Sequence, residues 1–478
     1  MAENLIAKKE FRGLTSSSLF KGLALVAWLF YFFGLFNGVT YFQENTETRT
    51  HAQEESYQQW LNQEDKGPHS AAHYGLYAFK PVPALSIMDK GMEDFLGSAT
   101  WLEAHNQNEV MMRAVDDGNS LIKYNSVTVG FLWQFLLPLI LLILTFNAVT
   151  KEKENGTLTM LLSTGTSGRY ILMGKVMGIL KAFMLYIFIP QVVILIITLL
   201  VTAGGGVSRE LGFLTLVIVF YLVLYFLIAN LSVYLSAIFK TSSQVLIVSI
   251  GFWVVATFIL PRLYGSIAKH MYSTPSSYEF TYIVNEQRAK GMDGKGSYEI
   301  FQQKLKDSLF AVYKVNKIED LPIGFGGVAL EYSEKRDYAA YDKNYGEVHQ
   351  QFVKQDQLMN AGALFSPLLA MRNLSFGLSE TNIYRHLDFT NQAEVHRRDI
   401  ATKMNSDIVK YGSSKGKDEK YKYNAGKRLW KTVSNFDFKK PSFGEVVANQ
   451  WLNIVALLAW LGLAFYLRSK AEQNLKPV

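Results

Sequence analysis

Long apolar segments alternate with polar stretches along the whole chain. Five segments are apolar for about 20 residues or more, the length that crosses about 30 Å of hydrocarbon. They cover residues 19–42, 127–149, 182–203, 211–239 and 243–263. A sixth segment, residues 446–467, is apolar after a polar start. The pattern predicts an all-α polytopic membrane protein with six transmembrane helices.

Basic residues beside these segments predict the orientation of the chain, because cytoplasmic flanks of membrane spans are enriched in Lys and Arg. The basic flanks precede the first span and follow the second, fourth and sixth, and they include Lys8, Lys9, Lys151, Lys153, Lys240 and Arg468. These flanks alternate, so both termini are predicted to be cytoplasmic. Residues 1–18, a hairpin at residues 150–181 and a tail at residues 468–478 then face the cytoplasm.

Two large polar insertions are predicted on the opposite side of the membrane, at residues 43–126 and residues 264–445. The chain contains no cysteine, so the insertions must be stable through their own cores or by packing on each other. The second insertion carries a stripe at helical spacing, which consists of Tyr338, Tyr341, Tyr345, Val348 and Phe352. We expect mainly helical insertions, α or α+β, and we interpret the stripe as helix packing. A substrate surface is the alternative.

Composition and motifs argue against several function classes. The net charge of +7 is modest for 478 residues, and no basic stretch resembles a nucleic-acid surface. The predicted spans have no ionisable residue near their centres, where ion-driven transporters usually place one. Residues 168–176 only faintly resemble a phosphate-binding loop, with five residues between the glycines instead of four. We therefore predict a membrane chain that is not an enzyme, binds no cofactor, and receives energy from another chain.

From the sequence alone, the histidines provide little support for a metal site. His69 and His73 are four residues apart, so one helical turn could present both to a metal ion. Two ligands without a cysteine or a nearby third ligand are weak support. We therefore predict no metal site and interpret both histidines as solvent-exposed.

Residues 151–162 directly follow the second predicted span and combine charge with an apolar face. Gly156 allows a change of direction, and Leu158, Leu161 and Leu162 recur at helical spacing. A short helix at this position could transmit a push from a soluble partner into spans two and three. An ordinary interfacial loop is the alternative interpretation.

The same segment resembles a known family signature. Residues 152–158, residues 161–163 and the pair Gly174 and Lys175 resemble the coupling-helix pattern of type-2 ABC exporter permeases. Residues 6–12 resemble the interfacial elbow helix of that family. The resemblance implies that the residues coupling the chain to an ATPase are Glu152, Glu154, Gly156, Thr157, Leu158, Leu161 and Leu162.

The insertions resemble those of a bacterial subgroup of these permeases that has two large extracytoplasmic insertions and is known only as a domain of unknown function. Residues 366–375 and 393–397, with His386 and Phe389 between them, are similar to its signature, and so are residues 77–85. The likeness extends over nearly the whole chain.

The resemblance implies a permease subunit in the bacterial inner membrane. Its expected partners are ABC ATPase subunits that bind ATP and Mg²⁺, a second permease chain, the lipid bilayer, and a periplasmic or cell-surface protein. No nucleic acid is expected. Two alternatives stay open: a subunit that transmits motion to an envelope partner without transport, and a scaffold without an ATPase. No residue pattern identifies a substrate.

Overall fold

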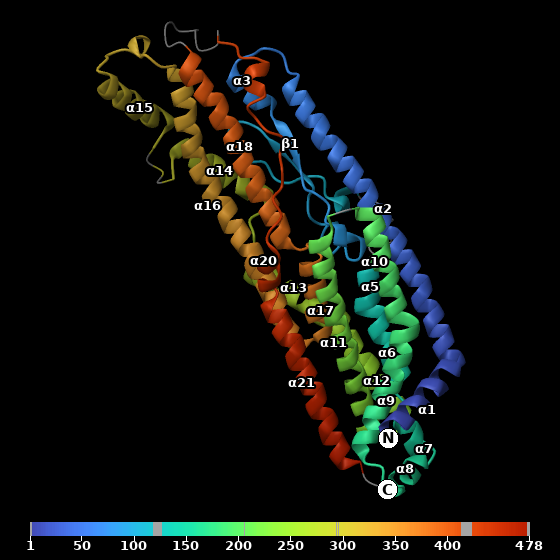
Figure 1. The fold of residues 1–478 in the computed structure, drawn as a ribbon. Coiled ribbons are helices and arrows are strands. Elements are labelled where there is room, and N and C mark those ends of the chain that lie inside the picture. Colours follow the sequence, from blue (N-terminus) through green and yellow to red (C-terminus); the bar gives the residue numbers. More distant parts are fainter. Residues whose placement is uncertain are drawn as a thin grey trace.

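The structure is a computed structural model that describes residues 2–117, 127–204, 206–292, 294, 296–412 and 423–475. Within these ranges the chain is mainly helical, with two short strands (Figure 1). Six helical segments among them are long and apolar enough to cross a membrane. These observations confirm the predicted all-α polytopic fold with six spans. The end of the first predicted insertion, residues 118–126, lies outside the described residues.

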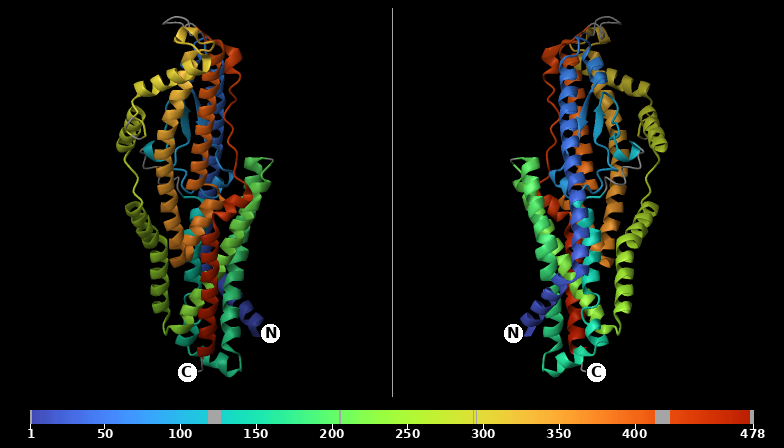
Figure 2. Two further views of the ribbon diagram at one scale, coloured as in Figure 1. Left: turned by 90° about the vertical axis from the view of Figure 1, so that its left-hand side faces the viewer. Right: turned by 90° about the vertical axis from the view of Figure 1, so that its right-hand side faces the viewer.

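The apolar segments form one helical bundle (Figure 2). Its helices, with the short helices that flank them, are α1 (Ala2–Ser16), α2 (Ser18–Leu61), α5 (Val129–Phe131), α6 (Leu137–Thr145), α7 (Thr150–Glu154), α8 (Thr157–Ser163), α9 (Gly168–Phe183), α10 (Ile189–Ala203), α11 (Ser208–Ile238), α12 (Ser242–Val254), α13 (Leu260–Met271) and α21 (Trp451–Asn474). Buried side chains from all six spans contribute to one hydrophobic core.

Three of the spans contain a single wide turn of π-helix, and each of these turns lies just before a proline. The turns are Leu132–Leu136, Met184–Phe188 and Val255–Ile259. Prolines follow at positions 138, 190 and 261. A proline has no N–H and its ring clashes with the carbonyl four residues earlier, so the preceding turn widens and the helix then continues.

The polar insertions fold together into one lobe beyond the end of the bundle (Figure 1). Its elements are α3 (Pro68–Tyr74), β1 (Leu76–Phe79), β2 (Ala99–Leu102), α14 (Ser277–Lys290), α15 (Tyr298–Tyr313), α16 (Phe325–Ala361), α18 (Ile383–Tyr411) and α19 (Lys427–Trp430). Helices α17 (Pro367–Leu378) and α20 (Phe443–Ala448) also belong to the second predicted insertion, but they contribute buried side chains to the core of the bundle. Short 3₁₀ turns cover Ala84–Ile87, Ala114–Asp117, Ile318–Asp320 and Gly362–Phe365. Strands β1 and β2 pair antiparallel, with Leu76 opposite Leu102.

The two insertions share one hydrophobic core. Trp60 and Leu102 from the first insertion pack with Phe389 and Trp430 from the second. The indole N–H of Trp60 donates to the carbonyl of Trp430 at 3.0 Å. The lobe therefore forms by packing of the insertions on each other, which was one of the two ways predicted for a cysteine-free chain.

The tyrosine stripe of α16 packs on the first insertion. The hydroxyl of Tyr341 lies 3.3 Å from Oδ1 of Asn106, and the hydroxyl of Tyr345 donates to the carbonyl of Gln107 at 3.1 Å. These two tyrosines pack against the first insertion, whereas Val348 and Phe352 of the stripe line a hollow together with His386.

Helix α2 joins the bundle to the lobe without a break. Its 44 residues span about 66 Å, roughly twice the hydrocarbon thickness of a bilayer. Figure 1 shows it extending from the end of the bundle near α1 to the far end of the lobe near α3. The first span is therefore continuous with the lobe.

Candidate functional site

The predicted coupling segment forms two short helices, α7 and α8. They lie at the end of the bundle where α1 begins and α21 ends, at the opposite end from the lobe (Figure 1). Gly156 joins them with a φ of 70°, in the left-handed region that favours glycine. The sequence prediction of a turn at Gly156 followed by a short helix is therefore confirmed.

Gly156 permits a test of this turn. A Cβ at this position would meet no atom within 4 Å, so the only cost of Gly156→Ala is the left-handed backbone, about 1–2 kcal/mol. We expect Gly156→Ala to increase amide hydrogen exchange in α8. The amides of α8 should exchange more slowly in Gly156→Asn than in the alanine variant, because asparagine tolerates the left-handed conformation better. Equal exchange in both variants would contradict the role of the backbone.

Glu152 points into the protein rather than toward solvent. Its carboxylate lies 2.9 Å from Nζ of Lys175 on α9, and 3.9 Å from Nζ of Lys9 on α1. The side chain of Glu152 is 13% exposed and that of Lys175 is 2% exposed. Lys175 also pairs with Glu10 of α1 at 2.9 Å. One buried lysine thus joins α1, α7 and α9.

The next two charged residues of α7 close the ends of two other spans. The ammonium of Lys153 donates to the carbonyls of Ala237 and Phe239 at the end of α11, the latter at 2.9 Å. The carboxylate of Glu154 accepts from the backbone N–H and the hydroxyl of Ser242 at the start of α12, at 2.7 and 2.8 Å. Helix ends leave such groups without partners inside the helix, and these charges satisfy them.

Helix α8 has one buried face and one exposed face. Leu158 is 5% exposed and belongs to the core of the bundle, while Leu161 and Leu162 pack against that core from its edge. Thr157 is exposed, and Met160 on the other face is 69% exposed. The leucines therefore fix α8 to its own chain, and Thr157 and Met160 form the surface that a partner can reach.

Small residues bring the N-terminal helix close to the third span. A Cβ on Gly174 would lie 2.8 Å from Cβ of Ile6, and a Cβ on Gly178 would lie 2.5 Å from the carbonyl of Ala7. Glycines four residues apart allow such close helix packing. The sequence pattern had included Gly174 and Lys175 but had not identified Lys175 or Glu10 as coupling residues. The signal was Lys175 itself, a lysine between apolar stretches of α9.

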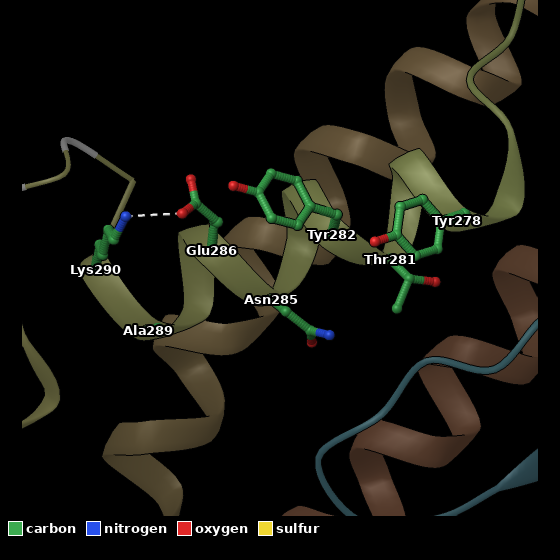
Figure 3. A pocket seen from close by; sticks show the side chains of 7 residues that line it. All are labelled: Tyr278, Thr281, Tyr282, Asn285, Glu286, Ala289 and Lys290. Carbon is green, nitrogen blue, oxygen red and sulfur yellow. Dashed lines mark hydrogen bonds and ion pairs between the residues drawn. The ribbon is translucent and has the colours of Figure 1, made fainter.

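A hollow on the surface of the lobe provides no comparable site. An open hollow follows one face of α14 between Tyr278 and Lys290 (Figure 3). All its lining residues belong to that helix, and Lys290 pairs with Glu286 at 2.7 Å. Side chains of a single exposed helix do not enclose a ligand.

A comparison with known families identifies the family of the chain. A family model described as ABC-2 family transporter protein matches residues 5–467, which is nearly the whole chain. The chain belongs to the ABC-2 transporter family. No curated protein matches the chain significantly. This ABC-2 permease is therefore the membrane component of an ABC transporter, in a family whose permeases are generally non-catalytic and work with an ABC ATPase.

Proposed function

We propose that this ABC-2 permease exports a substrate, or transfers it to the cell envelope, using ATP hydrolysis by a separate ATPase. ATP and Mg²⁺ would bind to the ATPase subunits, and a second permease chain would complete the pathway. The chain itself would be non-catalytic and would lie in the bacterial inner membrane with both termini in the cytoplasm. The lobe would then face the periplasm and meet a periplasmic or cell-surface protein.

The single observation that carries this proposal is the two-faced helix α8. Its exposed surface around Met160 lies at the tip of the hairpin between spans two and three, and its leucine face is fixed to the core of the bundle. A soluble partner that presses on the exposed face would move the buried face with it. This arrangement is what a coupling helix requires.

The charges of α7 extend that coupling to further helices. Glu152 pairs with Lys175 on α9, Lys153 holds the end of α11, and Glu154 holds the start of α12. A displacement of the hairpin would therefore reach spans two to five together, as a rigid-body shift of packed helices. In this proposal Glu152, Gly156, Leu158, Leu161 and Leu162 transmit the movement.

The remaining residues of the predicted set, Glu154 and Thr157, would contact the ATPase together with Met160, which the sequence prediction did not include. Glu154 is bound to Ser242, yet its side chain stays exposed, as do those of Thr157 and Met160. We propose that these three residues and the turn at Gly156 form the docking surface. Methionine suits such a surface because its flexible thioether adapts to a partner's groove.

A charge at position 160 tests this docking surface. Met160→Lys should lower the amount of ATPase that co-purifies with the chain by about tenfold, because a buried ammonium would replace an apolar contact. The melting temperature of the chain should not change, since the side chain is 69% exposed. Met112→Lys in the lobe, where the side chain is 58% exposed, is the matched control and should co-purify normally. Normal co-purification of the position 160 variant would reject the surface.

A second function is supported by the continuity between bundle and lobe. Arg209 at the start of α11 makes a two-pronged ion pair with Glu380 of the lobe, at 2.6 and 2.9 Å. Glu380 also pairs with Arg385 at 3.0 Å. Such a connection would serve a subunit that moves an envelope partner without transporting a substrate. Inside-out vesicles that are incubated with cell extract separate the two functions. ATP-dependent accumulation of any compound inside the vesicles supports export. No accumulation, together with a nucleotide-dependent change in the conformation of the lobe, supports transmission.

A further inference from the structure

Three histidines of the first insertion converge in the lobe. His69 and His73 lie one turn apart on α3, and His105 lies just after β2. The Nε2 atoms of His69 and His73 are 3.1 Å apart, and those of His69 and His105 are 3.3 Å apart. A ligand nitrogen from each of the three lies within 4.8 Å of the others. His105 supplies the third ligand that the sequence spacing of His69 and His73 lacked.

A buried carboxylate lies behind this cluster. Oε1 of Glu334, on α16 of the second insertion, is 3.6 Å from Nδ1 of His105, and the Glu334 side chain is 3% exposed. His105 thus directs Nε2 toward the other histidines and Nδ1 toward a carboxylate. Metal-bound histidines commonly have this arrangement, in which the outer carboxylate fixes the ring and its tautomer.

The segment that carries His105 is held in an unusual conformation. His105 has a φ of 67°, which side-chain-bearing residues rarely adopt. Neighbouring residues are fixed from the second insertion: Arg288 donates to Oδ1 of Asn106 at 3.0 Å, and Arg397 donates to the carbonyl of Glu103 at 3.1 Å. Strained residues that the surroundings hold in place cluster at functional sites. The contacts therefore fix the His105 ring where it faces α3.

The contacts among the three rings favour a cation at their centre. The Nε2 atom of His69 lies within hydrogen-bonding distance of Nε2 of both His73 and His105. Each short Nε2 contact needs one N–H donor and one acceptor lone pair, so hydrogen bonds among the three rings leave one lone pair without a partner. A cation at the centre would satisfy all three nitrogens.

We propose that His69, His73 and His105 form a binding site for a divalent transition-metal ion, with Glu334 as the positioning residue. Neutral imidazole ligands favour ions such as Zn²⁺. Calcium and magnesium prefer oxygen ligands, and the absence of cysteine removes the thiolates that select softer ions.

The distances suit zinc. Two nitrogens bound tetrahedrally at about 2.0–2.1 Å from zinc lie about 3.3 Å apart, close to the two measured separations of 3.1 and 3.3 Å. The third pair, within 4.8 Å, needs only a small ring movement. Three protein ligands leave one position for water. The ion would connect α3 to the segment after β2 and, through Glu334, to the second insertion.

Zinc binding by the full-length chain in detergent tests the site. The protein is purified with an affinity tag that contains no histidine, stripped with chelator, dialysed against Zn²⁺ and assayed for bound metal. We expect one zinc ion per chain and a raised melting temperature. His73→Gln, at an exposed position, should weaken binding by more than about 100-fold, and Glu334→Gln by about 10–100-fold. Co²⁺ in place of Zn²⁺ should show the visible absorption of a four-coordinate site.

The matched control is His51→Gln, which removes an exposed histidine from α2 outside the cluster. Its zinc content and affinity should equal those of the unchanged chain. The proposal is overturned if the unchanged chain binds no more zinc than the combined His69→Gln, His73→Gln and His105→Gln variant. It is also overturned if His51→Gln lowers binding as much as His73→Gln does.

Discussion

Replacing Glu152 and Glu154 together with lysine is expected to abolish the stimulation of ATP hydrolysis by the assembled transporter. The new lysine at position 152 would face Lys175 and Lys9, and the one at position 154 would face the N–H groups at the start of α12. Removing one partner of a buried ion pair costs about 3–5 kcal/mol, and reversal adds repulsion. The hairpin would separate from α9 and α12. The measurement is nucleotide hydrolysis by the purified complex in nanodiscs.

Two further variants separate the internal role of Glu152 from a direct contact with the ATPase. Glu152→Lys combined with Lys175→Glu keeps the charges of the buried cluster balanced, so it should restore part of the stimulation that Glu152→Lys alone removes. A direct ion pair between Glu152 and the ATPase predicts no recovery. Glu54→Lys with Glu55→Lys makes the same charge change on an exposed face of α2 and should leave hydrolysis unchanged. Stimulation that survives the double reversal at positions 152 and 154 would show that the hairpin does not couple.

The spans and the hairpin were predictable because their signals are local. A run of about 20 apolar residues is enough to identify a membrane helix, and the spacing of Leu158, Leu161 and Leu162 is enough to identify a helical face. Periodicity does not say whether that face meets the same chain or a partner. The resemblance implies that Leu158 helps to couple the chain to an ATPase, and the structure places its side chain in the core of the bundle.

The partners of charged residues could not be predicted, because they depend on contacts between distant parts of the chain. Glu152 meets Lys175 on the next helix, and His105 meets Glu334 on a helix of the other insertion. The short strands β1 and β2 were also not predicted individually, since four-residue apolar runs occur in helices and strands alike. The long stripe of α16 was identified because it repeats over several turns.

Replacing Lys80 with methionine is expected to lower the melting temperature of the chain by on the order of 10 °C. Lys80, just after β1, pairs with Glu93 at 3.0 Å, and their side chains are 0% and 1% exposed. The nearest other cation, Arg49 on α2, is 3.9 Å from Glu93. Burial alone would raise the pKa of Glu93, but Lys80 and Arg49 together hold it below its usual value. Loss of Lys80 therefore leaves an ionised carboxylate buried beside one distant partner.

A double-mutant cycle on Lys80 and Glu93 separates the cost of the unpaired buried charge from the cost of the other lost contacts. Adding Glu93→Gln to Lys80→Met removes the unpaired charge, so at least half of the lost stability should return. The matched control is Lys335→Met on α16, whose ion pair with Glu331 at 2.8 Å is 66% and 34% exposed. Exposed pairs contribute about 0–1 kcal/mol, so this variant should melt close to the unchanged chain. If the two lysine variants melt at the same temperature, the buried Lys80–Glu93 pair does not stabilise the lobe, and the shared hydrophobic core around Trp60 and Trp430 must do so.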